Sequence, residues 1–154
     1  MIDAWRLVKT SHQQDAFTGE GARLFGGRWN RPGTAMIYVS GSLALAAMEI
    51  FVHIRSTSLH LKFIYFSVTI PDDVSLTKID FNTLPPNWRE EPPPSATKNI
   101  GTQWVQDGQS AVLQIPSAIV PEEMNYLLNP LHSDFNKIKI SEPKPFHFDS
   151  RMWK

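Results

Sequence analysis

The residue whose setting most clearly suggests chemistry is Glu49, a carboxylate within the otherwise apolar segment SLALAAMEIFVH. On a helix over residues 42–54, Glu49 would lie one turn from Leu45 and nearly one turn from Val52, so it shares the apolar stripe. A carboxylate on a buried face costs free energy unless it is paired or used. The alternative is a rim position, where Glu49 only pairs with His53 four residues later. The sequence leaves both interpretations open.

Other common kinds of catalytic site find little support. Glu49 and His53 could share a metal ion, but two ligands are too few and no HExxH motif or carboxylate cluster completes a set, so we expect no metal site. The absence of cysteine excludes a thiolate nucleophile. No G-x-S-x-G elbow is present, so a serine hydrolase is not predicted. The candidate general bases are the histidines His12, His53, His60, His132 and His147.

Residues 11–35 form a glycine-rich and basic segment. Its glycines argue against a long helix or strand, and a long loop in a small domain is usually functional or disordered. The aromatic residues Phe17, Phe25 and Trp29 favour an ordered loop. Its backbone N–H groups and arginines could bind phosphates, although it matches neither a P-loop nor a Rossmann fingerprint, and an ordinary glycine-rich turn stays an alternative.

The elements that must position these residues follow from periodicity and turn signals. We expect two helices, over 42–54 with Ser42 as N-cap and over 95–107 with Gly108 at the end. A proline-rich stretch, 85–94, is expected to be an irregular surface excursion. The expected strands are 4–8, 36–40, 62–70 and 110–115, with further candidates at 136–140 and 146–149. This order predicts an α/β (α+β) fold with a mixed sheet flanked by helices.

Length and composition set the frame for this fold. The chain has 154 residues, of which 42% are hydrophobic, and these values predict a single compact domain over 1–154. Its 15 basic and 15 acidic residues balance, which argues against direct binding of nucleic acid. The apolar runs are too short for a membrane span, and the N-terminus does not resemble a signal peptide. We therefore expect a soluble, cytoplasmic domain without membrane attachment.

Three residues together resemble a known pattern. Arg28 in GGRWNRPG is followed ten positions later by Tyr38 in AMIYVS, and Glu49 follows eleven positions after that. This set resembles the RES-domain family, the toxin half of bacterial RES–Xre toxin–antitoxin pairs.

The resemblance spans roughly residues 4–132 and includes two further regions. The segment SAVLQIPSAIVPEEMNYLLNP resembles a downstream block of the family, with Ser117 as the matching serine and Asn125 in the matching asparagine-rich run. Arg6 fits the N-terminal pattern. The proline-rich stretch carries no usable family motif.

The resemblance implies a core similar to ADP-ribosyltransferases, acting on NAD as a substrate and without a separate cofactor. Members cleave the nicotinamide–ribose bond, and some transfer ADP-ribose to a protein; either activity arrests growth. For this chain we expect water or phosphate as acceptor, because its sequence shows no dedicated base for a protein side chain. A cognate Xre-like antitoxin would block the site, and DNA would be reached only through it. A homodimer stays open. The alternative function is a non-catalytic nucleotide- or protein-binding module on the same fold.

The implied roles agree with the chemistry of the side chains. Nicotinamide leaves NAD as a neutral molecule, so one carboxylate, Glu49, suffices to stabilise the oxocarbenium-like ribose. The planar fork of Arg28 suits a pyrophosphate or a ribose oxygen. Tyr38 would stack on nicotinamide or orient Arg28 and Glu49. The remaining substrate-binding candidates are Arg6, Arg31, Ser117, which would bond substrate or Glu49, and Asn125.

Overall fold

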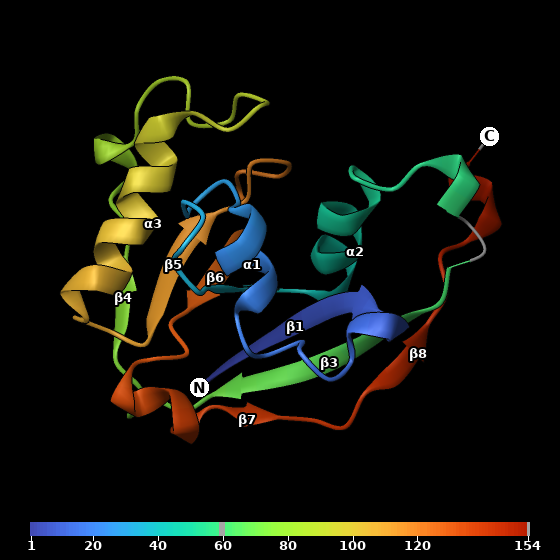
Figure 1. Cartoon of the computed structure of the whole chain (residues 1–154), viewed down its shortest axis with the longest axis horizontal. Coiled ribbons are helices and arrows are strands. Elements are labelled where there is room, and N and C mark those ends of the chain that lie inside the picture. The colour runs from blue at the N-terminus through green and yellow to red at the C-terminus, as the bar shows by residue number, and fades with distance from the viewer. Residues whose placement is uncertain (59–60, 154) are drawn as a thin grey trace.

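An eight-stranded mixed sheet forms the frame of the molecule, seen here in a computed structural model that describes residues 1–58 and 61–153 (Figure 1). The strand order is β4-β5-β6-β2-β1-β3-β7, and β8 also pairs with β3. The strands are β1 (Ile2–Lys9), β2 (Ile37–Ser40), β3 (Phe63–Ile70), β4 (Leu76–Lys78), β5 (Val112–Pro116), β6 (Met124–Leu128), β7 (Lys139–Ile140) and β8 (Lys144–Phe146). β4 and β5 run parallel and the other pairs antiparallel, which confirms the predicted mixed sheet.

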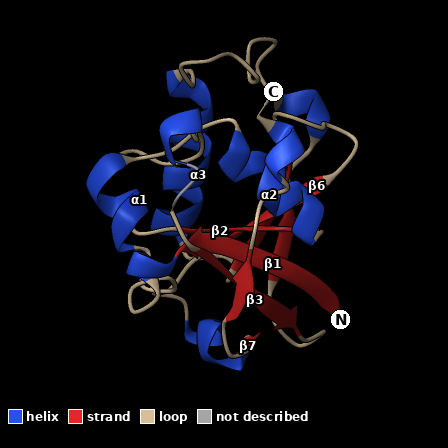
Figure 2. Cartoon of the chain, turned by 90° about the vertical axis from the view of Figure 1, so that its right-hand side faces the viewer, coloured by secondary structure: helices blue, strands red, loops and turns tan. Residues whose placement is uncertain are grey.

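The helices α1 (Glu20–Phe25), α2 (Leu43–Phe51) and α3 (Ser95–Asp107) lie on the same side of the strands (Figure 2). Short 3₁₀ turns are η1 (Thr10–His12), η2 (Ser56–Ser58), η3 (Phe81–Thr83), η4 (Ser133–Lys137) and η5 (Ser150–Met152). None of the helices in the described residues has the length and apolar character needed to cross a membrane.

α2 begins where the sequence predicts it. The Ser42 hydroxyl caps it by accepting a hydrogen bond from the Leu45 backbone N–H at 3.0 Å. Leu45 and Ala46 are buried, and Ala46 packs with Leu7 of β1. α2 ends at Phe51 rather than at residue 54. Its packing on β1 fixes which side of the helix faces the sheet, and therefore the direction of Glu49.

α3 matches its predicted bounds and packs on the other end of the sheet. Trp104 lies in one apolar cluster with Leu113 of β5. Gly101 is required there, because a Cβ atom would lie 1.8 Å from the carbonyl oxygen of Trp29. Gly108 ends the helix with a φ of 62°. The glycine-rich segment is thereby held between α3 and the sheet.

Several predicted elements differ from the structure. The segment 11–35 contains the six-residue helix α1, set between Gly19 and Gly26, both of which have positive φ. β4 and β6 were not predicted, because their pairing with β5 and β2 is long-range rather than encoded in local alternation. Of the stretch expected as a strand over 136–140, the first two residues belong to the 3₁₀ turn η4, and only Lys139 and Ile140 are extended, as β7.

Candidate active site

One cavity of about 920 Å³ collects most of the predicted site residues. Arg6 reaches it from β1, Arg28 from the loop after α1, and Tyr38 from β2, while Glu49 comes from α2 and Asn125 from β6. The register of the sheet explains part of this meeting, since Ser40 of β2 pairs with both Trp5 of β1 and Asn125 of β6. Residues far apart in the sequence therefore line one space.

Glu49 is held through one of its two carboxylate oxygens. Its Oε1 accepts hydrogen bonds from Ser117 Oγ and from Asn125 Nδ2, each at 2.7 Å. No bond or ion pair in the described residues joins Glu49 to His53, and Oε2 has no protein partner there. Glu49 thus takes the paired position on the apolar helix rather than the rim pair. Its second oxygen is left available to a ligand.

The two donors to Glu49 differ in their other contacts. Ser117 is fully buried, and its Oγ also accepts the backbone N–H groups of Ile119 and Val120 at 3.0 and 3.1 Å. Asn125 Oδ1 is buried and accepts no hydrogen bond from the described residues. A buried acceptor without a donor is costly, so this oxygen is a natural place for a ligand donor. Of the two roles expected for Ser117, its contacts provide the bond to Glu49.

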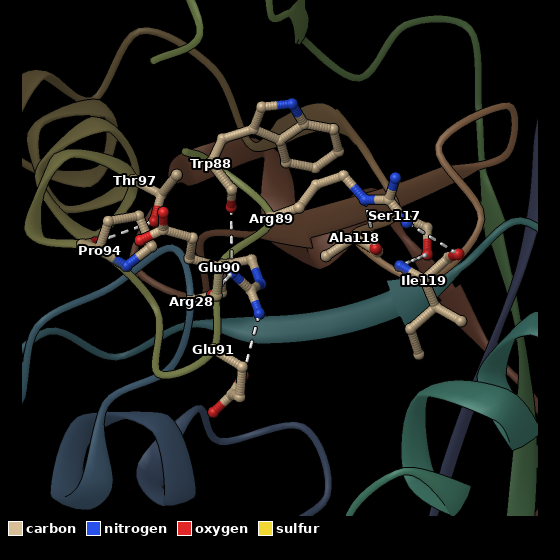
Figure 3. Close-up of polar contacts among 10 residues, drawn as sticks. All are labelled: Arg28, Trp88, Arg89, Glu90, Glu91, Pro94, Thr97, Ser117, Ala118 and Ile119. Carbon is tan, nitrogen blue, oxygen red and sulfur yellow. Dashed lines mark hydrogen bonds and ion pairs between the residues drawn. The ribbon is translucent and has the colours of Figure 1, made fainter. Parts of the chain in front are cut away.

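Arg28 is bound by the proline-rich segment (Figure 3). Its Nη1 donates to the carbonyl oxygens of Trp88 at 3.0 Å and Glu90 at 2.7 Å. Its Nη2 forms an ion pair with Glu91 Oε2 at 3.0 Å. The Arg28 side chain is only 16% exposed. The stretch 85–94 is therefore one wall of the cavity, a role that its sequence did not indicate.

Arg89 ties the same segment to the opposite side of the cavity. Its Nε donates to the Ala118 carbonyl at 2.8 Å and its Nη2 to that of Ile119 at 3.4 Å. Ala118 follows Ser117, the donor to Glu49. Residues 85–94 thus form a strap along the cavity, and Figure 3 shows it bound to Arg28 at one end and to Ala118 and Ile119 at the other.

Tyr38 braces the loop that carries Arg28. Its hydroxyl donates to Asn30 Oδ1 at 2.6 Å and accepts the Trp29 backbone N–H at 3.2 Å. Burial raises the pKa of Tyr38 well above its usual value, so the hydroxyl stays protonated. Gly27 is needed because a Cβ atom there would lie 2.6 Å from the Tyr38 hydroxyl oxygen. These contacts favour an orienting role for Tyr38 over stacking on nicotinamide.

Asn30 is a structural member of the site that sequence reasoning missed. It is fully buried. Its Nδ2 donates to the carbonyl oxygens of Ala22, Arg31 and Thr34. The signal was the asparagine that follows Arg28 and Trp29 in the motif, because a buried amide can tie several loop carbonyls together. Asn30 therefore sets the shape of the loop and, through Tyr38, its attachment to β2.

Arg6 brings a second guanidinium to the cavity. Its Nε donates to the Ala16 carbonyl and its Nη1 to the Tyr38 carbonyl at 2.9 Å, while its Cζ lies 5.9 Å from the centre of the Phe17 ring. Burial lowers the pKa of Arg6 to about 10, and the charge of Asp15 opposes this only in part. Arg6 is therefore still a cation at neutral pH.

The structure does not bring Arg31 to this group. Arg31 is exposed and faces α3, where its Nε donates to Asn99 Oδ1 at 2.7 Å and its backbone N–H to Thr102 Oγ1 at 2.9 Å. It is not among the described residues that line the cavity. His60, one of the candidate bases, lies outside the described residues. Within the described ranges, no group of three or more His, Cys, Asp or Glu side chains could hold a metal ion.

Fold and cavity together define a mixed α+β protein in which Glu49 faces the same space as Arg6 and Arg28. The family model described as RES domain matches residues 3–149. The chain therefore belongs to the RES-domain family, as its Arg28–Tyr38–Glu49 pattern led us to expect.

Relatives of this family cover nearly the whole chain. A protein named Toxin Res from Yersinia enterocolitica is 39% identical over 149 residues, which are 96% of this chain and 97% of the relative. A protein named Prs ADP-ribosylating toxin from Sphingobium is 38% identical over 153 residues, 96% of this chain and 94% of the relative. The crystal structure of the M. tuberculosis MbcT–MbcA toxin–antitoxin complex has the same fold, with a TM-score of 0.76, 16% identity, and coverage of 95% of this chain and 84% of that one.

Proposed function

We propose that this chain is the toxin of a toxin–antitoxin pair and that it consumes NAD by cleaving the nicotinamide–ribose bond, with water or inorganic phosphate as acceptor. The observation that carries the proposal is the Glu49 carboxylate in the cavity wall. It is fixed through Oε1 by Ser117 and Asn125, while Oε2 is left for a ligand. A carboxylate held in this way needs no rearrangement when positive charge develops beside it.

The reaction fits a site with one such carboxylate. The bond between the ribose C1′ and the nicotinamide nitrogen breaks, and its electron pair neutralises the positive nitrogen of the leaving group. The ribose is left as an oxocarbenium-like cation, which Glu49 stabilises through its charge and by accepting a hydrogen bond from a ribose hydroxyl. The acceptor oxygen then bonds to C1′, and its proton passes to solvent.

The cations of the cavity suit the pyrophosphate of NAD. Arg28 has Nε and part of Nη2 uncommitted, and Arg6 presents Nη2, which has no hydrogen bond within the described residues. Phe25 lines the cavity and is 84% exposed, so it offers a flat face to a base. Asn125 Oδ1 offers an acceptor to an amide or hydroxyl.

The choice of acceptor depends on the position of His53, the histidine that lines the cavity within the residues that the structure describes. His53 lines the cavity but is exposed and comes from the turn just beyond α2, on the same side as the acid. A base must reach the proton that it abstracts, so a small acceptor is favoured over a protein hydroxyl. The second candidate function is protein ADP-ribosylation, because one relative that is 38% identical is named Prs ADP-ribosylating toxin.

The test follows NAD labelled in its ADP-ribose part, incubated with the purified protein in buffer, in buffer with phosphate, and in cell lysate. Free nicotinamide together with ADP-ribose, or with an ADP-ribose phosphate ester when phosphate is present, supports the proposal. Label found mainly on a protein band would replace it with the second candidate. No release of nicotinamide in any arm would leave a non-catalytic binding module.

An antitoxin partner follows from a toxin that consumes NAD, since the free enzyme would harm its own host. We propose that a segment of an Xre-like antitoxin closes the cavity, and that an acidic or carboxylate-terminated segment suits Arg6 and Arg28. The structural neighbour MbcT is solved with MbcA as a toxin–antitoxin complex. A purified complex that consumed NAD at the full rate would overturn this blocking model.

A further inference from the structure

Arg28 donates hydrogen bonds to two chemically different kinds of acceptor. The carbonyl oxygens of Trp88 and Glu90 are neutral and belong to the backbone, whereas Glu91 contributes a charged side chain. The two carbonyls take Nη1 and Glu91 takes Nη2, so Nε and one hydrogen of Nη2 stay free. The guanidinium is therefore oriented by the backbone and neutralised by Glu91.

The pairing with Glu91 is the weaker of these attachments. Glu91 is 67% exposed and touches Arg28 through a single bond to Nη2. Elsewhere in the chain, Arg23 with Glu20 and Arg151 with Asp149 each use Nε and Nη2 together. An ion pair in which the carboxylate is exposed and forms one bond is weak, whereas a bidentate bond from arginine to a phosphate is stronger. Glu91 thus holds a position from which an anion can displace it.

The wall of the cavity does not depend on Glu91. The bonds of Arg89 to Ala118 and Ile119 fasten the strap on the far side, and the Thr97 hydroxyl donates to the Pro94 carbonyl at 3.1 Å (Figure 3). The prolines at 92–94 fix φ in the backbone that follows. The Glu91 side chain can therefore leave Arg28 without opening the strap.

We propose that Glu91 is the exchangeable counter-anion of Arg28. In the empty cavity it neutralises the guanidinium, and it gives way to a phosphate group of a dinucleotide substrate while the Trp88 and Glu90 carbonyls keep Arg28 in place. This inference rests on the proposed function, because the displacing anion is taken to be the pyrophosphate of NAD. Glu91 then sets the affinity for phosphate-bearing ligands and leaves the bond-breaking step unchanged.

The experiment compares Glu91→Gln with Glu90→Gln. Both remove one negative charge from neighbouring positions, but in the described residues the Glu90 side chain forms no hydrogen bond or ion pair with Arg28, and its carbonyl survives the substitution. We expect Glu91→Gln to lower KM for NAD about two- to fivefold with kcat unchanged, because the exposed Glu91 carboxylate no longer competes with the ligand for Arg28. Glu91→Ala should act in the same direction, and Glu90→Gln should match the wild type. A KM for Glu91→Gln equal to that of Glu90→Gln, or a higher one, would overturn the proposal.

Binding of ADP-ribose, measured by calorimetry, separates this proposal from the proposed function. If the wild type releases no nicotinamide while Glu91→Gln still binds ADP-ribose more tightly than Glu90→Gln, the proposed role of Glu91 as counter-anion is supported and the proposed cleavage of NAD is refuted. Should the wild type cleave NAD while the two variants behave alike, only the counter-anion is refuted. A wild type that neither cleaves NAD nor binds ADP-ribose refutes both.

Discussion

Replacement of Glu49 by glutamine tests the function with little disturbance of the fold. The glutamine side chain keeps an Oε1 atom that can still accept from Ser117 Oγ and Asn125 Nδ2, both at 2.7 Å in the present structure. The change is at the second side-chain atom, which has no protein partner in the described residues: the charged Oε2 of glutamate is replaced by the neutral amide group Nε2 of glutamine. If Glu49 stabilises the ribose cation, the loss is about 2.7–4 kcal/mol of transition-state stabilisation, or roughly a hundred- to a thousandfold in kcat.

Glu49→Ala is the matched comparison, since it removes the acceptor itself. Ser117 Oγ and Asn125 Nδ2 would then be donors without their partner, at a cost of about 1–3 kcal/mol in unfolding free energy. For a domain of this size, that corresponds to a fall in Tm of roughly 2–10 °C. Glu49→Gln should stay close to the wild-type Tm or exceed it, because removing a charge from a functional pocket is often neutral or stabilising.

The assay is the release of nicotinamide from NAD, followed by chromatography, with a thermal melt of each variant and growth arrest on expression. The expected pattern is an inactive, non-toxic Glu49→Gln with wild-type stability, beside an inactive and less stable Glu49→Ala. A Glu49→Gln enzyme with more than about a tenth of wild-type turnover would refute the catalytic assignment. A marked fall in its Tm would instead favour a purely structural carboxylate.

Four further outcomes are expected. Arg28→Lys should lose nearly as much kcat/KM as Arg28→Ala, because an ammonium lacks the fork that spans several acceptors; recovery of most activity would make Arg28 only a point charge. Tyr38→Phe leaves an amide oxygen and a backbone N–H unpaired and should lower the unfolding free energy by about 1–3 kcal/mol in a urea titration, which an unchanged midpoint would contradict. Chelator treatment should leave NAD turnover unchanged, and a loss restored by one added divalent ion would refute this. The backbone hydrogen bond from Ser75 lowers the pKa of Asp134 from 3.8 to about 2, so the carboxylate contributes stability that is present above pH 3.8 and lost as the pH falls toward 2. Asp134→Asn should therefore have a lower Tm than the wild type at pH 7, and this difference should shrink as the pH falls toward 2. An equal difference in Tm at neutral and at acid pH would refute this cause.

The elements that were predictable are those whose signals lie within a dozen residues. Ser42 caps α2 and Gly108 ends α3, as predicted. The apolar spacing of α2 identified the buried Leu45, but Met48 and Val52 of the same predicted stripe are exposed. β6 escaped prediction because the sequence MNYLL does not alternate, and its place follows from pairing with β2 and β5. Local signals define elements, whereas strand order is a long-range property.

The same division applies to the site. The apolar stripe marked Glu49 as unusual, but its partners Ser117 and Asn125 lie 68 and 76 positions further along the chain. Only the family resemblance suggested that they belong together. Arg31 shows the opposite error, since it lies three positions from Arg28 and yet faces α3. Two residues that lie close together in a loop sequence need not point their side chains to the same side, because one turn of the backbone reverses the direction of the side chain.

What binds Arg28 was beyond the reach of sequence for a more general reason. Two of its acceptors are backbone carbonyls, at residues 88 and 90, and every residue has a carbonyl, so no side-chain pattern records them. It follows that substitutions at Trp88 and Glu90 keep the hydrogen bonds to Arg28 as long as the backbone path is kept. A substitution at Glu91 removes a charge instead. The strap therefore separates two tasks that a single acidic residue would combine: neutral groups set the orientation of the guanidinium, and an exposed carboxylate sets how readily an anion can reach it.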